Sequence, residues 1–387
     1  MRRRSRTALI TICAAALSTL VLVACGPPPD PAPQFDHFDP ITLGHGGVPG
    51  NASASGASVS ADGRWTAFRS AASNLVAGDT NGAEDTFLRD NSTGAVTRIA
   101  ESTLDAPMIS RNGRYVGVKF ADGATYGVHD RIAGTTSTWT GFSGQTVPVV
   151  TDDGTRAVHG TGSSFGIFST HCNLRDLTAG VTTSCPWGPA DYGAVALVGV
   201  SGNGRHVMYH WLDQSGGGTS AYYLWDVVSG QRVVLDGDFV ALGVSNVVSD
   251  DGSTIFAAGF GASLPPHIFD VASGTAEPFP GSPDGTVMPT GISPDGRWFA
   301  AVSDATNLVP DDTNDAADMF LLDRSDSSLS VLSRSFDSGA QLGFGGWHCG
   351  KSAGQVLDGG RVCVLAADEI SSADSNGAVD AFLTPAR

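Results

Sequence analysis

A short motif that recurs seven times is the feature that most constrains what this chain can fold into. It consists of an apolar run, the pattern Ser-x-Asp/Asn-Gly-Arg, and a second apolar run. The copies, some of them degenerate, begin at Ser60, Ser110, Thr151, Ser201, Ser249, Ser293 and Leu357. Asp-Gly or Asn-Gly between two apolar runs predicts a β-hairpin, because both central residues of a tight turn can adopt a positive φ.

A second pattern, Asp-x-x-x-Gly, follows most copies of the motif at the end of an aromatic or aliphatic run. It begins at Asp90, Asp130, Asp176, Asp226 and Asp270, and a sixth copy at Asp323 has lost the glycine. Each copy predicts a second hairpin, so one repeat holds four strands and recurs every 41–64 residues. Four-stranded units at this spacing are typical of β-propeller blades. The 50 glycines of the chain fit many tight turns.

The sequence therefore predicts an all-β, seven-bladed β-propeller of four-stranded antiparallel blades. The blades are expected at residues 51–100, 102–146, 147–186, 193–236, 239–280, 286–334 and 350–387. The seventh has room for three strands only, whereas residues 36–47 are spare ahead of the first blade. We expect this N-terminal segment to close the ring as the missing strand, because an open ring leaves unpaired edges. A six-bladed ring with one divergent blade is the alternative.

Two stretches, Val59–Ala100 and Ile292–Ser333, resemble the TolB-type, WD40-like β-propeller repeat found in bacterial lipoproteins. The resemblance covers nearly all of residues 36–387 and is strongest in the first and sixth blades. The Gly-His and Trp-Asp signatures of eukaryotic WD repeats are not kept. The resemblance implies a propeller fold and no particular activity, because one fold hosts many functions.

The N-terminus predicts export. Four arginines precede an apolar stretch over residues 7–24, and Leu22-Val23-Ala24-Cys25-Gly26 resembles a bacterial lipobox, in which Cys25 is lipidated. The alternatives are an ordinary secretory signal and an uncleaved anchor. We expect a signal peptide at residues 1–24, a stiff Pro-rich spacer at 25–35 and one propeller domain at 36–387. The protein is then lipid-anchored to the cell membrane, facing the periplasm or the cell exterior.

The charge balance is acidic, with 22 Lys and Arg against 39 Asp and Glu, a net charge of −17. Nucleic acid and anionic lipid surfaces need cationic patches, so neither is an expected partner. Contact with a membrane is expected through the lipid anchor alone. A protein, peptide or glycan ligand, and in particular a cationic group, a metal ion or a neutral sugar, remains compatible with this charge. We expect a monomer.

Four cysteines lie in the predicted propeller, at Cys172, Cys185, Cys349 and Cys363. An even number in an exported protein predicts disulfides. Cys172 and Cys185 should lie opposite each other, because Asp176 opposite Val181 puts 172 opposite 185 in the same hairpin register. Cys349 and Cys363 form the second expected pair, without such a register argument.

Three long loops share the pattern Asp-x-Asn-x-x-x-Asp, and ring closure would make their blades neighbours. The pattern residues are Asp79, Asn81, Asp85, Asp312, Asn314, Asp318, Asp374, Asn376 and Asp380. Oxygen ligands at loop positions 1, 3 and 7 indicate a possible Ca²⁺ site, although the bidentate Glu at position 12 of a calcium loop is absent from the sequence. The alternative is that these side chains cap their own backbone in Asx-turns.

The sequence favours a non-catalytic binding or scaffolding propeller at the bacterial cell envelope, and it does not name the ligand. The alternative is an enzyme, a hydrolase or lyase, with its site in the central channel. Such a site would need His, Asp or Glu from several blades on the innermost strands. The predicted innermost strands are instead mostly apolar or small, as at residues 107–109 and 147–150.

Overall fold

The computed structural model describes residues 39–141, 146–161, 171–186, 193–213, 220–235, 243–259, 266–310, 312, 316–332, 355–366 and 380–384. The predicted signal peptide, the lipidation residue Cys25 and the Pro-rich spacer lie outside these residues. The predictions for them therefore stay predictions. Among the described residues, no helix is long and apolar enough to cross a membrane.

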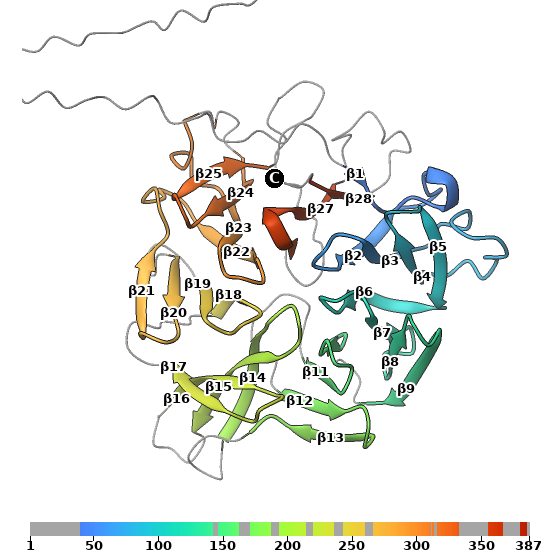
Figure 1. Ribbon diagram of the computed structural model, residues 1–387, viewed down its shortest axis with the longest axis horizontal. Helices are drawn as coiled ribbons and strands as arrows, with labels where there is room; N and C mark the ends of the chain where they lie inside the picture. The colour runs from blue at the N-terminus through green and yellow to red at the C-terminus, as the bar shows by residue number, and fades with distance from the viewer. Residues whose placement is uncertain are drawn as a thin grey trace, which may run out of the picture.

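The described residues form four-stranded antiparallel sheets arranged as blades of a ring (Figure 1). Blade 1 holds β2 (Ala54–Val59), β3 (Trp65–Ser70), β4 (Asp85–Asp90) and β5 (Ala95–Ala100). Blade 2 holds β6 (Thr103–Ile109), β7 (Tyr115–Phe120), β8 (Thr125–Asp130) and β9 (Thr135–Thr140). Blade 3 holds β10 (Val149–Val150), β11 (Arg156–Thr161), β12 (His171–Asp176) and β13 (Val181–Ser184).

The second half of the ring repeats this order. Blade 4 holds β14 (Gly193–Val200), β15 (His206–Asp213), β16 (Ser220–Asp226) and β17 (Arg232–Leu235). Blade 5 holds β18 (Gly243–Val248), β19 (Thr254–Gly259), β20 (His267–Asp270) and β21 (Thr275–Pro278). Blade 6 holds β22 (Val287–Ile292), β23 (Trp298–Ser303), β24 (Asp318–Asp323) and β25 (Ser328–Val331). Blade 7 holds β26 (Gln355–Val356), β27 (Val362–Ala366), β28 (Asp380–Leu383) and β1 (Asp39–Pro40).

Ring closure occurs as the sequence predicts. In β1, Asp39 pairs with Leu383 and Pro40 with Phe382, so the N-terminal strand is the outer strand of blade 7. The next residue, Ile41, donates its N–H to the Ala381 carbonyl at 2.8 Å. The seven-bladed prediction is confirmed, and the six-bladed alternative is wrong.

The recurring motif builds the turn between the first and second strands of a blade. In blade 1 the Ser60 hydroxyl donates to Asp62 Oδ1 at 2.5 Å and accepts from the Trp65 N–H at 2.9 Å. Gly63 follows with φ +73°, a backbone region that favours glycine. The same serine bonds recur at Ser110, Ser249 and Ser293. The side chains of the first and third motif residues therefore fix the turn, and the side chain of the second motif residue takes no part in these bonds.

The apolar core of the described residues lies between blades. Each buried cluster joins two neighbouring blades, for example Phe68 and Phe87 of blade 1 with Leu383 of blade 7. The first strands of neighbouring blades also contact one another, as β2 does with β6 and β18 with β22. The first strands therefore form the innermost layer of the ring (Figure 1). The turn that follows each first strand carries the motif, so the motif turns lie around the same end of the central channel.

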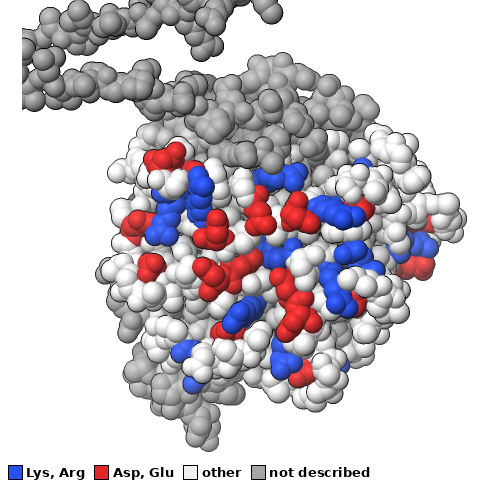
Figure 2. All heavy atoms as spheres, in the orientation of Figure 1, with Lys and Arg blue, Asp and Glu red and all other residues white. Residues whose placement is uncertain are grey.

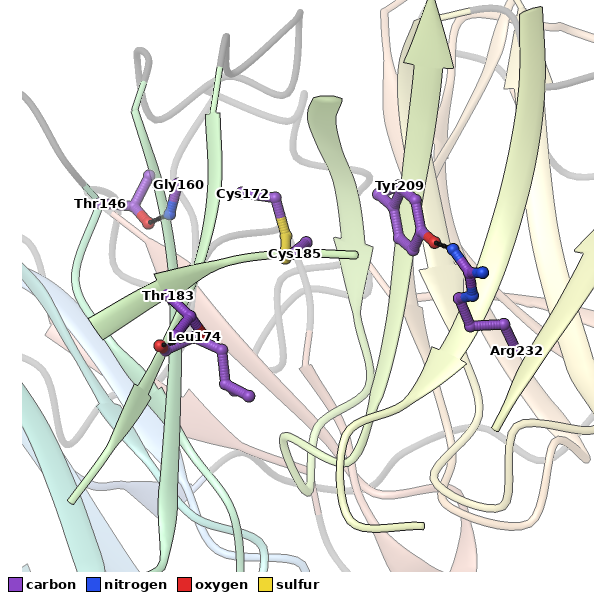
Figure 3. The surroundings of a disulfide bond; sticks show 8 residues. All are labelled: Thr146, Gly160, Cys172, Leu174, Thr183, Cys185, Tyr209 and Arg232. Atoms are coloured by element: carbon purple, nitrogen blue, oxygen red, sulfur yellow. Dashed lines mark hydrogen bonds between the residues drawn. A yellow bond between two sulfur atoms is a disulfide. The ribbon is translucent and has the colours of Figure 1, made fainter. Parts of the chain in front are cut away.

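The predicted disulfide in blade 3 is present. Cys172 and Cys185 are bonded, with their Cα atoms 5.3 Å apart, and the pairing of Asp176 with Val181 gives the expected register. Figure 3 shows this bond beside Tyr209 of blade 4, and all three residues belong to the core between these blades. Cys363 in β27 is also disulfide-bonded. Cys349, its predicted partner, lies outside the described residues.

A candidate binding site at the channel mouth

Closure of the ring brings the second residue of every motif copy to one end of the central channel. We call these residues the channel mouth: they are Ala61, Arg111, Asp152, Gly202, Asp250, Pro294 and Asp358. Backbone hydrogen bonds link them from blade to blade. Asp358 N–H donates to the Ala61 carbonyl at 3.1 Å, and Ala61 N–H donates to the Arg111 carbonyl at 2.8 Å. Asp250 N–H likewise donates to the Pro294 carbonyl at 3.1 Å, so several neighbouring turns are joined directly at the mouth.

Asparagine side chains of the motif add further links between blades. Asn112 of blade 2 donates two hydrogen bonds to Asp152 of blade 3. Its backbone N–H donates to Asp152 Oδ1 at 3.0 Å, and its Nδ2 donates to the Asp152 carbonyl at 2.7 Å. Asn203 of blade 4 donates to Asp250 in the same two ways, at 3.0 and 2.9 Å. The carboxylates of Asp152 and Asp250 are therefore held in fixed positions by the neighbouring blade.

One basic side chain crosses the mouth. Arg111 extends from blade 2, and its Nε lies 3.0 Å from Asp250 Oδ2 in blade 5. Its Nη1 donates to the Val356 carbonyl of blade 7 at 2.9 Å, and its Nη2 to the Ile292 carbonyl of blade 6 at 3.3 Å. The side chain is 7 % exposed. It therefore joins blade 2 to blades 5, 6 and 7, none of which is its direct neighbour in the ring.

The carboxylates at the mouth outnumber this cation. Burial, and then the nearby charge of Asp250, raises the pKa of Asp152, although Arg111 opposes the change. Desolvation likewise raises the pKa of Asp358, with Arg111 opposing and Asp250, Asp295 and Asp62 adding to the rise. Figure 2 shows acidic side chains around the middle of this face of the propeller, with basic side chains among and beside them. The mouth is an acidic site that favours positively charged groups.

The first of the predicted calcium loops is held together by an arginine. Arg98 Nη1 lies 3.2 Å from Asp79 Oδ1 and 2.9 Å from Asp85 Oδ2. Asn81 donates its Nδ2 to both oxygens of Asp85, at 3.0 and 3.1 Å, and its Oδ1 accepts from the Ala83 N–H at 2.9 Å. This last bond is the Asx-turn of the alternative interpretation.

The other two loops are described only in part. Asp312 and Asp318 lie in the described residues, with Asp318 fully buried at the start of β24, and Asp380 begins β28. Asn314, Asp374 and Asn376 lie outside them. In the described part of the chain, no group of three or more His, Cys, Asp or Glu is arranged to hold a metal ion. Calcium binding by these loops stays a prediction.

Sequence reasoning missed the channel mouth. The motif was recognised by its Ser, Asp/Asn and Gly, whereas the residues that meet at the mouth occupy the variable position between them. The signal that was available is the chemistry of that position: it carries an acid in three copies and an arginine in one. Only the closed ring shows that these residues face a common centre.

The chain was compared with known proteins. No protein-family model matches it, and no curated protein matches it. Many solved structures match, among them two with 12–13 % sequence identity. The β-propeller domain of the Trilobed protease from Pyrococcus furiosus, described as having an open velcro topology, has 13 % identity and a TM-score of 0.50. The match covers 72 % of this chain and 84 % of that one.

The second structure is the oligogalacturonate lyase of Vibrio parahaemolyticus, with 12 % identity and a TM-score of 0.56, over 90 % of this chain and 96 % of that one. Likeness at such low identity shows the fold alone. The TolB-type resemblance and the lipoprotein prediction gain no support from these matches. Together with the blade topology, they identify the chain as a seven-bladed β-propeller protein.

Proposed function

We propose that this protein is a non-catalytic binding propeller whose channel mouth recognises a cationic group on a partner protein or peptide. The observation that carries the proposal is the excess of carboxylates at the mouth, two of which, Asp152 and Asp250, are held by the neighbouring blade. Asp152, Asp250 and Asp358 face a single guanidinium, that of Arg111. Carboxylates that are held by neighbouring blades are preorganised, so little ordering is needed when a cation binds.

The same charges argue against the enzyme alternative in its polysaccharide form. An oligogalacturonate is a polyanion, and the carboxylates of the mouth would repel it. An arginine or lysine side chain of a partner, in contrast, meets acceptors of the kind that Arg111 already uses. The overall net charge of −17 adds long-range attraction for a basic partner.

The proposed setting is the cell envelope. The segment up to Cys25 has the pattern of a lipoprotein signal, and the Pro-rich residues 25–35 would separate the propeller from the membrane. A lipid-anchored propeller of this kind would hold a soluble or membrane partner near the bilayer. The anchor, and not the acidic propeller surface, would supply the membrane contact.

Calorimetric titration with a blocked tetra-arginine peptide tests the proposal. We expect binding that weakens as salt is added, because exposed charges are screened. We expect the double variant Asp152→Asn, Asp358→Asn to weaken binding about tenfold or more, since close charge pairs couple by about 1.5 kcal/mol or more. A tetra-glutamate peptide should not bind.

The matched control is Glu101→Gln. Glu101 lies between β5 and β6, at the opposite end of the blades from the mouth, and its side chain is 62 % exposed. The variant removes one negative charge without changing the mouth, and its affinity should stay within about twofold of the wild type. The double variant removes two negative charges and the control removes one. If the control loses half as much binding free energy as the double variant, the peptide responds to net charge and the proposed site is wrong.

A further inference from the structure

Arg111 is unlike the other residues of the channel mouth. At the equivalent positions the chain has Ala61, Asp152, Gly202, Asp250, Pro294 and Asp358, all of them short. The turn of blade 2 does not depend on the arginine side chain. It is fixed by Ser110, which bonds to Asn112 and to the Tyr115 N–H, as in the other blades. The turn of the repeat therefore does not explain why blade 2 has a long side chain at this position.

The guanidinium of Arg111 is held as an arginine ligand would be held. The carboxylate of Asp250 forms an ion pair with its Nε at 3.0 Å, and the carbonyls of Val356 and Ile292 accept from its Nη1 and Nη2 at 2.9 and 3.3 Å. These acceptors come from blades 5, 6 and 7. A planar guanidinium with five donors suits such a mixed set better than the point charge of a lysine.

A glycine in blade 4 leaves the space that the Arg111 side chain occupies. Gly202, the mouth residue of blade 4, lies directly against Arg111, and a Cβ atom built there would overlap the Nε and Cζ region of the guanidinium. Gly202 does not have a positive φ, so an alanine would be tolerated by the backbone but not by Arg111 in its present position. The position of the arginine therefore depends on the absence of a side chain at residue 202.

We propose that Arg111 is a built-in competitor: its guanidinium occupies the position at the channel mouth that an arginine of the partner takes when it binds. This inference rests on the proposed function and specifies it further, because it names a guanidinium as the group recognised. Binding then requires Arg111 to leave Asp250 and the two carbonyls. The observed affinity is lowered by the fraction of molecules in which the mouth is open.

The test compares the affinity of the blocked tetra-arginine peptide for wild type and for Arg111→Met. Methionine keeps an unbranched apolar stem and removes the guanidinium with all its donors. If the mouth of the wild type is open in about a tenth of molecules, we expect the variant to bind about tenfold more tightly. A tetra-lysine peptide should gain less, because it lacks the planar donor set. Unchanged or weaker binding of the arginine peptide would overturn the proposal.

The matched control is Arg114→Met. Arg114 lies three residues away on the same face and pairs with Asp130 at 2.8 Å, with its side chain 40 % exposed. Its loss makes the same change in net charge but leaves the mouth occupied. If both variants tighten binding equally, the gain is an effect of net charge and Arg111 is not a competitor.

A second variant keeps the test valid if Arg111→Met fails to fold because Asp250 is left buried without its partner. Arg111→Gln keeps an amide donor near Asp250 and leaves the guanidinium position free, and it should also tighten binding of the arginine peptide. If wild type binds and the mouth acids are required, but neither variant tightens binding, the competitor is wrong and the proposed function stands. If neither the wild type nor the variants bind the peptide, the proposed function fails.

Discussion

At the scale of single residues, an arginine at the end of the motif, or directly after it in blade 3, pairs with the last residue of the third strand in five blades. The pairs are Arg64–Asp90, Arg114–Asp130, Arg156–Asp176, Arg205–Asp226 and Arg297–Asp323. In blade 6 the pair is bidentate, with distances of 2.9 and 2.7 Å. The hydrogen bond from Arg297 lowers the pKa of Asp323 to about 2. Blade 5 has Ser253 in place of the arginine.

Replacing Arg297 by Met should raise the pKa of Asp323 from about 2 towards its usual 3.8. A lowered pKa stabilises the fold above the unfolded-state pKa, and this contribution is lost as the pH falls through the folded value. The variant should therefore lose about 1 kcal/mol or less of unfolding free energy at neutral pH, since the arginine side chain is 49 % exposed. The deficit should vanish as the pH falls through about 2.

Carbon-13 NMR titration of the carboxyl groups measures this shift, and Asp270 of blade 5 is the internal control. Its pKa is lowered chiefly by hydrogen bonds from Ser273 and should be the same in both proteins. If the Asp323 midpoint does not move, the arginine is not the cause of its low pKa.

At the scale of elements, the long loop between β3 and β4 is joined to β5 by one cluster of charges. Asp85 is fully buried and accepts hydrogen bonds from Arg98, Asn81 and the Ser102 N–H. Arg98 belongs to β5, so the cluster fixes the loop to the outer strand of its own blade. In this arrangement protein donors already surround the carboxylate that a calcium ion would need.

We expect Asp85→Asn to lower the unfolding free energy by about 2 kcal/mol, because the variant leaves Arg98 without its most buried partner. The loss should be the same with added calcium and with a chelator, as followed by thermal unfolding. Glu101→Gln, which removes the exposed partner of Arg98, should cost less than about 1 kcal/mol. A loss seen in calcium but absent in chelator would instead establish the blade 1 loop as a calcium site.

At the scale of the whole molecule, the ring is closed by a very short strand. β1 has two residues, but the residues that follow it add to the closure. Ile41 and Thr42 are buried, and Ile41 packs in the core between blades 7 and 1. Arg89 of blade 1 donates to the Leu43 carbonyl at 2.8 Å. Closure therefore rests on the packing of this segment as much as on the strand pairing itself.

Ile41→Ala should lower the unfolding free energy by about 2–4 kcal/mol, the range for a large core residue. Val48→Ala, at a position 53 % exposed, should cost less than about 0.5 kcal/mol. Deleting residues 36–47 should lower the melting temperature of the whole propeller, and deleting residues 26–34 should not. Equal effects of the two deletions on urea and thermal unfolding would contradict closure by the N-terminal segment.

The features of this structure that the sequence predicts are those that depend on residues close together in the chain. Blade number, closure and the Cys172–Cys185 register follow from spacing along the chain, because hairpin turns and strand pairs relate residues close in sequence. The contacts of Arg111 with Asp250, Ile292 and Val356 join residues that meet only after the ring has closed. The Arg98 cluster was missed for a simpler reason: the loop was interpreted without the strand that follows it.

The second residue of the motif, which lies at the channel mouth, can vary from blade to blade while the turn around it is kept. Ser and Asp/Asn on either side of it fix the turn, and blades accept Ala61, Gly202 and Pro294 there as well as charged residues. Specificity can therefore evolve by single substitutions at one residue per blade while the hairpins stay intact. For protein engineering, the same ring offers a small combinatorial library, in which positions 111, 202 and 250 have to be varied together because their residues contact one another.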